Sequence, residues 1–183
     1  MEIENEALEV ILTRRSVRSF TGEAVPRDSL MKILKAGMAA PSARNIQPWA
    51  FVAVTERGLL DSLCERLPYA KMLDKAGAAV IVCGIPGKDM VHGGEYKDAI
   101  GGKYWVMDCS AAAENILLAC HAMGFGAVWT AAYPNEDRID TVRDIIGVPE
   151  DVIPLAVIPI GVPKDKGKVT DKFKEENIRW ERW

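Results

Sequence analysis

Two spacings of apolar residues alternate along this chain, and together they predict a mixture of helices and strands. Aliphatic side chains recur every three or four positions over residues 5–13 and again between Pro26 and Pro41, which indicates two helices with one apolar face each. Short apolar runs bounded by proline or glycine are typical of buried strands. Such runs span residues 49–55, 78–85 and 153–161, with a weaker one at 126–132. Because Pro159 has no backbone N–H to donate, we expect the third run to be an edge strand or to carry a bulge.

Residues 103–123 form the most apolar helical segment of the chain. Alanine, leucine and isoleucine occupy almost every face, and the main polar interruptions are Asp108, Glu114 and Asn115. Asp108 and Glu114 are spaced so that they lie on different sides of a helix and do not form an acid–base pair. A helix that is apolar nearly all round must be covered on most sides. The cover comes either from the rest of the same chain or from a partner subunit.

The C-terminal residues 162–183 are highly charged but end with Trp180 and Trp183. A tryptophan side chain needs apolar cover. We therefore expect an arm that docks either on its own body or on a partner subunit. A solvated tail with exposed aromatic rings is the alternative.

The composition is that of an ordinary globular domain. With 183 residues, 49% of them hydrophobic and 27% charged, the chain fits one compact unit. The net charge of -3 argues against a nucleic-acid binder, which usually presents a basic field. No apolar run reaches the length of about 18 residues that a membrane-spanning helix needs, and the N-terminus is acidic where a signal peptide would be basic. We expect a cytoplasmic protein that binds neither nucleic acid nor a membrane.

Cysteine and histidine are too few and too scattered for a metal site. The four cysteines form no C-x-x-C pair, and there are only two histidines. We expect four free thiols, as in a protein of a reducing compartment. His121 lies within the apolar helix, where a packing role is favoured over that of a catalytic base. Neither a Gly-x-Ser-x-Gly turn nor a His-Glu-x-x-His helix is present, so the sequence shows no hydrolase machinery.

Three short segments carry groups suited to a ligand. The first is RRSVR, which places two guanidinium groups and a hydroxyl together whether it is extended or helical, and this suits a phosphate. Arginines that merely complement the dipole of the first helix are the alternative. The second is the proline-bounded loop PSARNIQPW, whose amide side chains suit the edge of a heteroaromatic ring, although an ordinary turn between a helix and a strand is favoured without further context. The third is GFGAVWTAA, which lacks the third glycine and the strand-to-helix order of a dinucleotide fingerprint but offers small residues to a flat ligand.

Taken in order, these segments resemble the nitroreductase family of flavoproteins. The similar stretches are RRSVRSF, AAPSARNIQPWAF, NILLACHAMGFGAVWTAAYP and PLAVIPIGVPKDK, which together extend over nearly the whole chain. The resemblance implies an α+β fold, in which helices flank a central, mostly antiparallel sheet in a sandwich, built as an intertwined homodimer. Residues 1–183 would be a single FMN-binding domain, with 162–183 as an arm that docks on the partner subunit.

The resemblance also implies a function. Members bind FMN at the subunit interface and pass electrons from NADH or NADPH to an acceptor in two half-reactions. The expected acceptor is a nitroaromatic, a quinone or a similar conjugated molecule. Reductive dehalogenation or dehydrogenation within the same family, and a flavin-storage module without catalysis, are the alternatives. The flavin carries the chemistry, so no catalytic side chain and no metal are expected.

The residues expected to hold FMN follow from the matching motifs. The phosphate, the ribityl chain and the pyrimidine edge would be bound by Arg14, Arg15, Ser16 and Arg18. The other subunit would contribute Pro41, Ser42, Ala43, Asn45 and Gln47. The isoalloxazine ring would be bordered by backbone groups of Thr130, Ala131 and Ala132. The phosphate would also be flanked by Gly161 and Lys164, with Lys166 or Lys168 as further candidates.

Residues 87–103 separate the second strand from the long helix. Within them, His92, Gly93, Gly94 and Tyr96 are candidates for shaping the mouth of the substrate site. A plain surface loop is the alternative, because glycine pairs are typical of loops.

Overall fold

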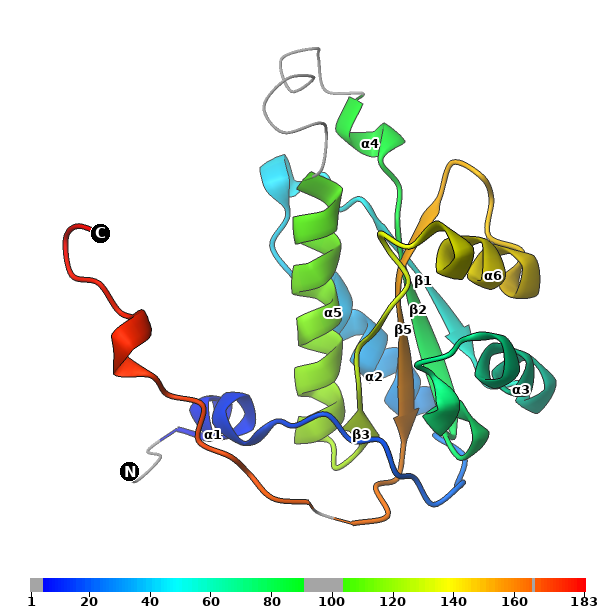
Figure 1. The fold of residues 1–183 in the computed structure, drawn as a ribbon, viewed down its shortest axis with the longest axis horizontal. Helices are drawn as coiled ribbons and strands as arrows, with labels where there is room; N and C mark the ends of the chain where they lie inside the picture. The colour runs from blue at the N-terminus through cyan, green and yellow to red at the C-terminus, as the bar shows by residue number, and fades with distance from the viewer. Residues whose placement is uncertain (1–4, 91–103, 166) are drawn as a thin grey trace.

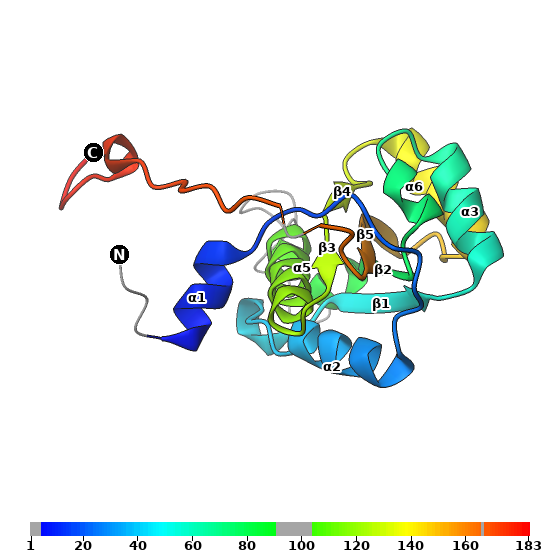
Figure 2. The ribbon, with the colours of Figure 1, turned by 90° about the horizontal axis from the view of Figure 1, so that it is seen from below.

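The computed structural model describes residues 5–90, 104–165 and 167–183, and it has three layers (Figure 1). A sheet lies in the middle (Figure 2). One face of it is covered by α2 (Arg27–Met38) and α5 (Tyr104–Ala122), and the other by α3 (Arg57–Arg66) and α6 (Glu136–Ile146). This arrangement confirms the expected sandwich of helices around a central sheet.

The sheet is antiparallel throughout. Its order is β1 (Trp49–Val54), β2 (Ala78–Gly84), β5 (Ile153–Gly161) and β3 (Gly126–Ala127), and β4 (Thr130–Ala131) also pairs with β5. The three strongly apolar runs are therefore strands, as the sequence predicts. The weaker run at 126–132 is split into two short strands.

The expectation that Pro159 marks an edge strand is wrong, and the bulge that β5 does carry lies at Leu155, whereas Pro159 stands in regular register with Ala79. β5 lies inside the sheet, with β2 on one side and β3 and β4 on the other. The carbonyl of Ile160 accepts a hydrogen bond from Gly77, on the β2 side, so the backbone of its neighbour Pro159 faces the opposite side. On that side, β3 pairs with Ile160 and Gly161 of β5, and β4 pairs with Ala156 and Val157. Pro159 lies between these two paired stretches. The missing N–H is tolerated because the neighbouring strand is interrupted there.

Side chains alternate between the two faces of the central strands, and each face forms its own hydrophobic core. In β2, Val80 and Val82 pack against α2 and α5, whereas Ala79 and Ile81 pack against α3 and α6. These residues are fully buried, because both faces of the sheet are covered. Close approach of α2 to α5 depends on Gly37, where a Cβ would lie 2.9 Å from Cγ1 of Ile116.

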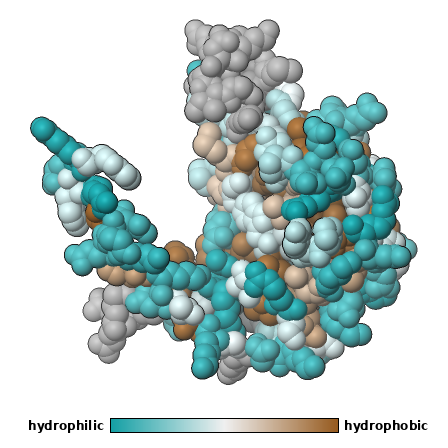
Figure 3. Space-filling view, in the orientation of Figure 1, coloured by the Kyte–Doolittle hydropathy of each residue, from teal (hydrophilic) through white to brown (hydrophobic). Residues whose placement is uncertain are grey.

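The long helix α5 is covered by its own chain on one side only. Its buried side chains include Ala112, Ile116 and Leu117, whereas Met107 is 54% exposed. In Figure 3 the surface over α5 is pale or brown, whereas the α3 and α6 side of the molecule is largely teal. Part of the apolar surface of α5 is thus open in a single chain.

The first helix and the C-terminal arm project from the body on the same side, as Figures 1 and 2 show. The helix α1 (Glu6–Thr13) buries none of its side chains, and its Leu8 and Ile11 are about half exposed. The C-terminal arm extends through the short turn η3 (Glu175–Asn177), and Trp180 and Trp183 are almost fully exposed. The arm therefore does not dock on its own body. Docking on a partner subunit stays a prediction.

Candidate cofactor site

The N-terminal segment after α1 lies beside the end of β5. The N–H of Val17 donates to the carbonyl of Ala127 in β3 at 3.0 Å. The N–H of Lys164 donates to the carbonyl of Ser19, also at 3.0 Å. A Cβ on Gly126 would lie 2.6 Å from Cγ1 of Val17, so this glycine permits the contact. These contacts place the RRSVR segment next to the residues that follow β5.

The corner where these segments meet is rich in cations. Arg15 lies against Gly167, where a Cβ would be 2.9 Å from the arginine Nε. Ser16 and Arg18 are exposed in the same segment as Arg15. Lys164 and Lys168 are exposed in the segment that follows β5. Guanidinium and ammonium groups with a hydroxyl are the donor set that a phosphate requires. The described residues at this corner therefore fit a phosphate, whereas Lys166 lies outside them.

Arg14 is turned toward α5. Its Nε lies 3.0 Å from Oε1 of Glu114, in an ion pair that is partly shielded from solvent. Glu114 thus faces α1, and Asp108 faces the Ala43 loop. The sequence prediction that the two acids lie on different sides of the helix is confirmed.

His121 stands at the same corner. Its Nε2 is 2.8 Å from Oγ1 of Thr13 in α1. Burial lowers the pKa of His121 below its ordinary value, the Arg15 and Arg14 guanidinium groups lower it further, and Glu9 opposes them. His121 therefore links α5 to α1 and is not a residue of the apolar core.

The strand β4 presents an exposed backbone edge beside this corner. Among the described strands β4 pairs with β5 alone. Thr130 turns its hydroxyl inward to the carbonyl of Val157 at 2.6 Å, and Ala131 is exposed. Ala132 is buried, and its N–H donates to the carbonyl of Leu155 at 2.9 Å. A flat ligand can approach this edge closely, because the residues that face it are small.

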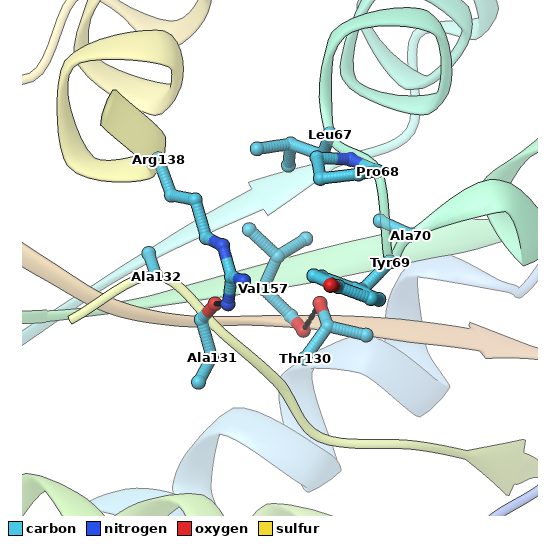
Figure 4. A pocket seen from close by; sticks show the side chains of 9 residues that line it. All are labelled: Leu67, Pro68, Tyr69, Ala70, Thr130, Ala131, Ala132, Arg138 and Val157. Atoms are coloured by element: carbon cyan, nitrogen blue, oxygen red, sulfur yellow. Dashed lines mark hydrogen bonds between the residues drawn. The ribbon is translucent and has the colours of Figure 1, made fainter. Parts of the chain in front are cut away.

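A hollow adjoins β4 and contains residues that the sequence motifs missed (Figure 4). Its floor includes Thr130, and its walls include Tyr69 from the loop after α3 and Arg138 from α6. Arg138 donates to the carbonyl of Ala131 at 3.2 Å, and its Cζ lies 4.6 Å from the centre of the Tyr69 ring. No sequence pattern marks Tyr69 or Arg138, because they lie on separate elements that meet only in the fold.

The PSARNIQPW loop has an unusual backbone. Arg44, Asn45 and Gln47 all have positive φ, at 51°, 56° and 53°. Such values are uncommon outside glycine and cluster at functional sites. The loop includes the short turn η1 (Ala43–Asn45), and its Ser42 hydroxyl accepts from the N–H of Gln47 at 3.0 Å.

This loop and the cation-rich corner lie at opposite ends of α5. Ala43 contacts Asp108, near one end of the helix, whereas Thr13 contacts His121, near the other (Figure 1). The separation of Asp108 from His121 along the helix is about 20 Å. One chain therefore unites the Arg15 corner with β4, but it does not bring the Ser42–Gln47 loop to them.

The part of the chain that the structure describes offers no metal site and no membrane-spanning helix, and two of its buried thiols are not nucleophiles. No group of three or more His, Cys, Asp or Glu side chains is placed to hold a metal ion there. The four cysteines are free, as expected, and burial raises the pKa of Cys83 and of Cys120 to about 12, so these thiols are not nucleophiles at neutral pH. No described helix has the length and apolar content to cross a membrane. The candidates His92, Gly93, Gly94 and Tyr96 lie outside the described residues.

Comparison with known proteins adds the family context. The model of the nitroreductase family matches residues 11–68 and 56–162. A protein of Methanothermobacter thermautotrophicus named "Putative NADH dehydrogenase/NAD(P)H nitroreductase" is 41% identical over 178 residues, covering 97% of this chain and 88% of its own. A crystal structure from Bacteroides thetaiotaomicron with the same name has a TM-score of 0.88 at 44% identity, covering 99% of this chain and 100% of that one. The FMN reductase (NADPH) of Bacillus subtilis is 25% identical over 170 residues, covering 87% of this chain and 66% of its own.

Proposed function

Because this chain belongs to the nitroreductase family, we propose that it is an FMN-dependent oxidoreductase that takes a hydride from NADH or NADPH and reduces a nitroaromatic, a quinone or a similar conjugated acceptor. The names of its relatives, which include an NAD(P)H nitroreductase and an FMN reductase, support the donor and the cofactor. The observation that carries the proposal is the cation-rich corner beside the open edge of β4, because these two features match the charged end and the flat end of FMN.

The phosphate of FMN would be bound at the corner. Its charge is close to -2 at neutral pH, and the chain as a whole is acidic, so local cations are needed to hold it. Arg15, Arg18 and Lys164 would supply charge-assisted hydrogen bonds, with the hydroxyl of Ser16 beside them. Arg14 would act less directly, since Glu114 already holds its Nε.

The flavin ring would lie along β4. Thr130 and Ala131 offer small side chains and the backbone edge of the strand. Arg138 and Tyr69 stand next to this edge, and Arg138 places a positive charge 3.2 Å from the carbonyl of Ala131. A fixed positive charge near the ring stabilises negative charge that develops there on reduction.

A second copy of the chain would complete the site. The loop from Ser42 to Gln47 lies at the far end of α5, so a two-fold pairing of two α5 helices would place the loop of one chain beside the corner of the other. The open surface of α5 and the exposed Leu8 and Trp183 would be covered in the same dimer. The side chains of Ser42 and Asn45 would then provide hydrogen-bonding groups to the edge of the ring.

When bound, FMN supplies the hydride-transfer chemistry, so the chain needs no nucleophile of its own. The chain's residues bind the phosphate, fix the orientation of the ring and present charge near it. The sequence and the described residues contain no competing machinery, such as a Gly-x-Ser-x-Gly turn or a metal cluster.

The first test is the absorption spectrum of the purified protein. We expect flavin bands, or their appearance after reconstitution with FMN, and bleaching within seconds of adding NADH or NADPH under anaerobic conditions. A nitroaromatic or a quinone should then restore the bands. A protein that cannot be reconstituted with FMN would end the proposal, and bound FMN that neither nucleotide bleaches would indicate a storage module.

The shared site has its own test by subunit mixing. Arg18→Ala and Asn45→Ala should each weaken FMN binding in homodimers. Unfolding and refolding the two variants together should restore tight binding to about a quarter of the sites, because half of the dimers would be mixed and each would hold one intact site. No recovery would contradict a site made from two chains.

A further inference from the structure

We propose that Asp108 and Lys88 are positioning residues that hold the Ser42–Gln47 loop in its left-handed conformation, so that the loop can reach the cofactor of the neighbouring subunit. The inference rests on the proposed function. It assigns a role to the buried carboxylate of Asp108, which the binding residues named above do not include.

The loop needs external support because its backbone is strained. Arg44, Asn45 and Gln47 adopt φ values between 51° and 56°. Asparagine tolerates this region, but arginine and glutamine strongly prefer right-handed or extended backbone. Without attachments, an exposed loop of this kind would relax to other conformations.

Bonds within the loop give it a shape but do not attach it to the body. The N–H of Asn45 donates to the carbonyl of Ser42, and the side-chain amide of Gln47 donates to Oδ1 of Asn45, both at 3.0 Å. These bonds close a compact turn. They would move with the loop if it shifted as a unit.

Asp108 attaches the start of the loop to α5. Its Oδ1 accepts from the N–H of Ala43 at 3.1 Å. Asp108 is only 7% exposed, and it is the one buried charged side chain among the described residues. A carboxylate is costly to bury unless hydrogen bonds compensate it, and such bonds are stronger away from water. Its placement against Ala43 therefore makes a firm attachment.

Lys88 attaches the end of the loop. It lies in α4 (Gly87–Met90), and its Nζ donates to the carbonyl of Gln47 at 3.2 Å. Lys88 itself is exposed, so this second attachment is weaker than the first. The two bonds hold the loop at Ala43 and at Gln47, on either side of the strained Arg44 and Asn45.

The consequence is a conformation that is fixed before the cofactor binds. Fixing the loop in advance reduces the entropy that binding would otherwise cost. Loss of either attachment should therefore lower the affinity for FMN and alter the polar contacts at the ring, although neither side chain needs to touch the cofactor.

The test compares FMN affinity in the full-length protein with variants at both attachments. Asp108→Ala should raise the dissociation constant of FMN, measured by quenching of flavin fluorescence, by about tenfold or more, and Lys88→Met should raise it by about threefold. Lys88→Arg keeps a donor and should restore affinity to within about twofold of the wild type. The absorption bands of FMN bound to Asp108→Ala should shift toward those of free FMN.

Matched controls separate this role from general stability. Asp61→Ala removes an exposed carboxylate paired with Arg57, and Lys32→Met removes an exposed lysine on α2. Both should leave the FMN dissociation constant within about twofold of the wild type. A lower melting temperature for Asp108→Ala with wild-type affinity and spectrum would overturn the inference.

Two further outcomes are distinct. If Asp108→Ala does not fold, the test rests on Lys88→Met, because Lys88 is exposed. Wild-type affinity for FMN in Lys88→Met would overturn the inference. If the wild-type protein itself does not bind FMN, the proposed function has failed rather than the positioning role alone.

Discussion

Nε2 of His121, close to the C-terminal end of α5, lies 2.8 Å from Oγ1 of Thr13, the last residue of α1. The Thr13 hydroxyl donates its own proton to the carbonyl of Glu9 at 2.6 Å, so its oxygen accepts from the Nε2–H of His121. Because α1 buries none of its side chains, this bond and the Arg14–Glu114 ion pair hold the base of α1 against α5. The contact also places a titratable ring beside the cation-rich corner.

Stability should fall in mild acid because of His121. Burial, Arg15 and Arg14 lower its pKa in the folded protein below the ordinary value of 6.5, so the unfolded chain takes up the proton first as the pH falls. Well above pH 6.5, His121 makes no such contribution to the free energy of unfolding. As the pH falls through and below 6.5, protonation of His121 in the unfolded chain destabilises the folded protein increasingly. The melting temperature of the FMN-free protein should therefore drop between about pH 7.5 and about pH 5.5.

His121→Gln should flatten that dependence. Differential scanning fluorimetry over the pH series compares the melting temperatures of this variant and of the wild type. An identical pH dependence in the wild type and in His121→Gln would contradict the prediction.

Gly126→Ala should disturb the cation-rich corner. The added Cβ would lie 2.6 Å from Cγ1 and 2.7 Å from Cβ of Val17, and the Cβ atom of Val17 cannot move without its backbone. Overpacking of this kind costs about 1–3 kcal/mol. We expect a lower melting temperature and weaker FMN binding, measured by fluorimetry and by flavin fluorescence.

Two variants test the cause of that effect. Gly58→Ala, whose Cβ would meet nothing closer than 3.8 Å, should behave like the wild type. Val17→Ala combined with Gly126→Ala should recover part of the loss. Wild-type affinity in Gly126→Ala alone would show that Val17 yields without moving the arginines.

Removing a guanidinium at the corner should weaken FMN retention. If the corner binds the phosphate of FMN, Arg15→Gln and Arg18→Gln would each delete a charge-assisted donor to it, which is worth about 1.5–3 kcal/mol, or roughly tenfold to a hundredfold in affinity. Riboflavin, which has no phosphate, should bind the variants and the wild type equally. Arg27→Gln, an exposed arginine at the start of α2, serves as the control. Full FMN retention would remove the substituted arginine from the site.

Shortening the arm should destabilise the dimer. Trp180 is 80% exposed and Trp183 fully exposed in one chain, so their removal takes no contact from the body of that chain. If they dock on a partner, truncation after Asn177 should raise the dimer dissociation constant measured by sedimentation. An unchanged constant and an unchanged melting curve would indicate a solvated tail.

The long apolar runs explain why much of the fold could be predicted. The strands β1, β2 and β5 and the helix α5 carry patterns that few other structures accommodate, because both faces of the sheet are buried. The position of Pro159 could not be predicted in the same way. Whether its missing N–H is tolerated depends on the gap between β3 and β4, which are two residues long and are defined by their pairing with β5.

The candidate site likewise contains residues that local sequence patterns predict and residues that only the fold brings together. Local chemistry in the sequence marks the arginines around Ser16 and the amides of the Ser42–Gln47 loop, because each group lies within a few consecutive residues. Tyr69 and Arg138 carry no such mark, since an exposed tyrosine and an arginine in a first helical turn are ordinary in any protein. Asp108 stood out in the sequence only as a polar interruption of an apolar helix.

The sequence by itself thus determined the strands, the long helix and the groups able to bind a phosphate and a heteroaromatic edge. It did so because these depend on periodicity and on neighbours along the chain. Only the tertiary structure decided that Lys164 lies beside Ser19, that the Ser42–Gln47 loop stands at the other end of α5, and that Asp108 holds Ala43. Those relationships join residues far apart in the chain, so they depend on how the layers pack and cannot be derived from any local pattern.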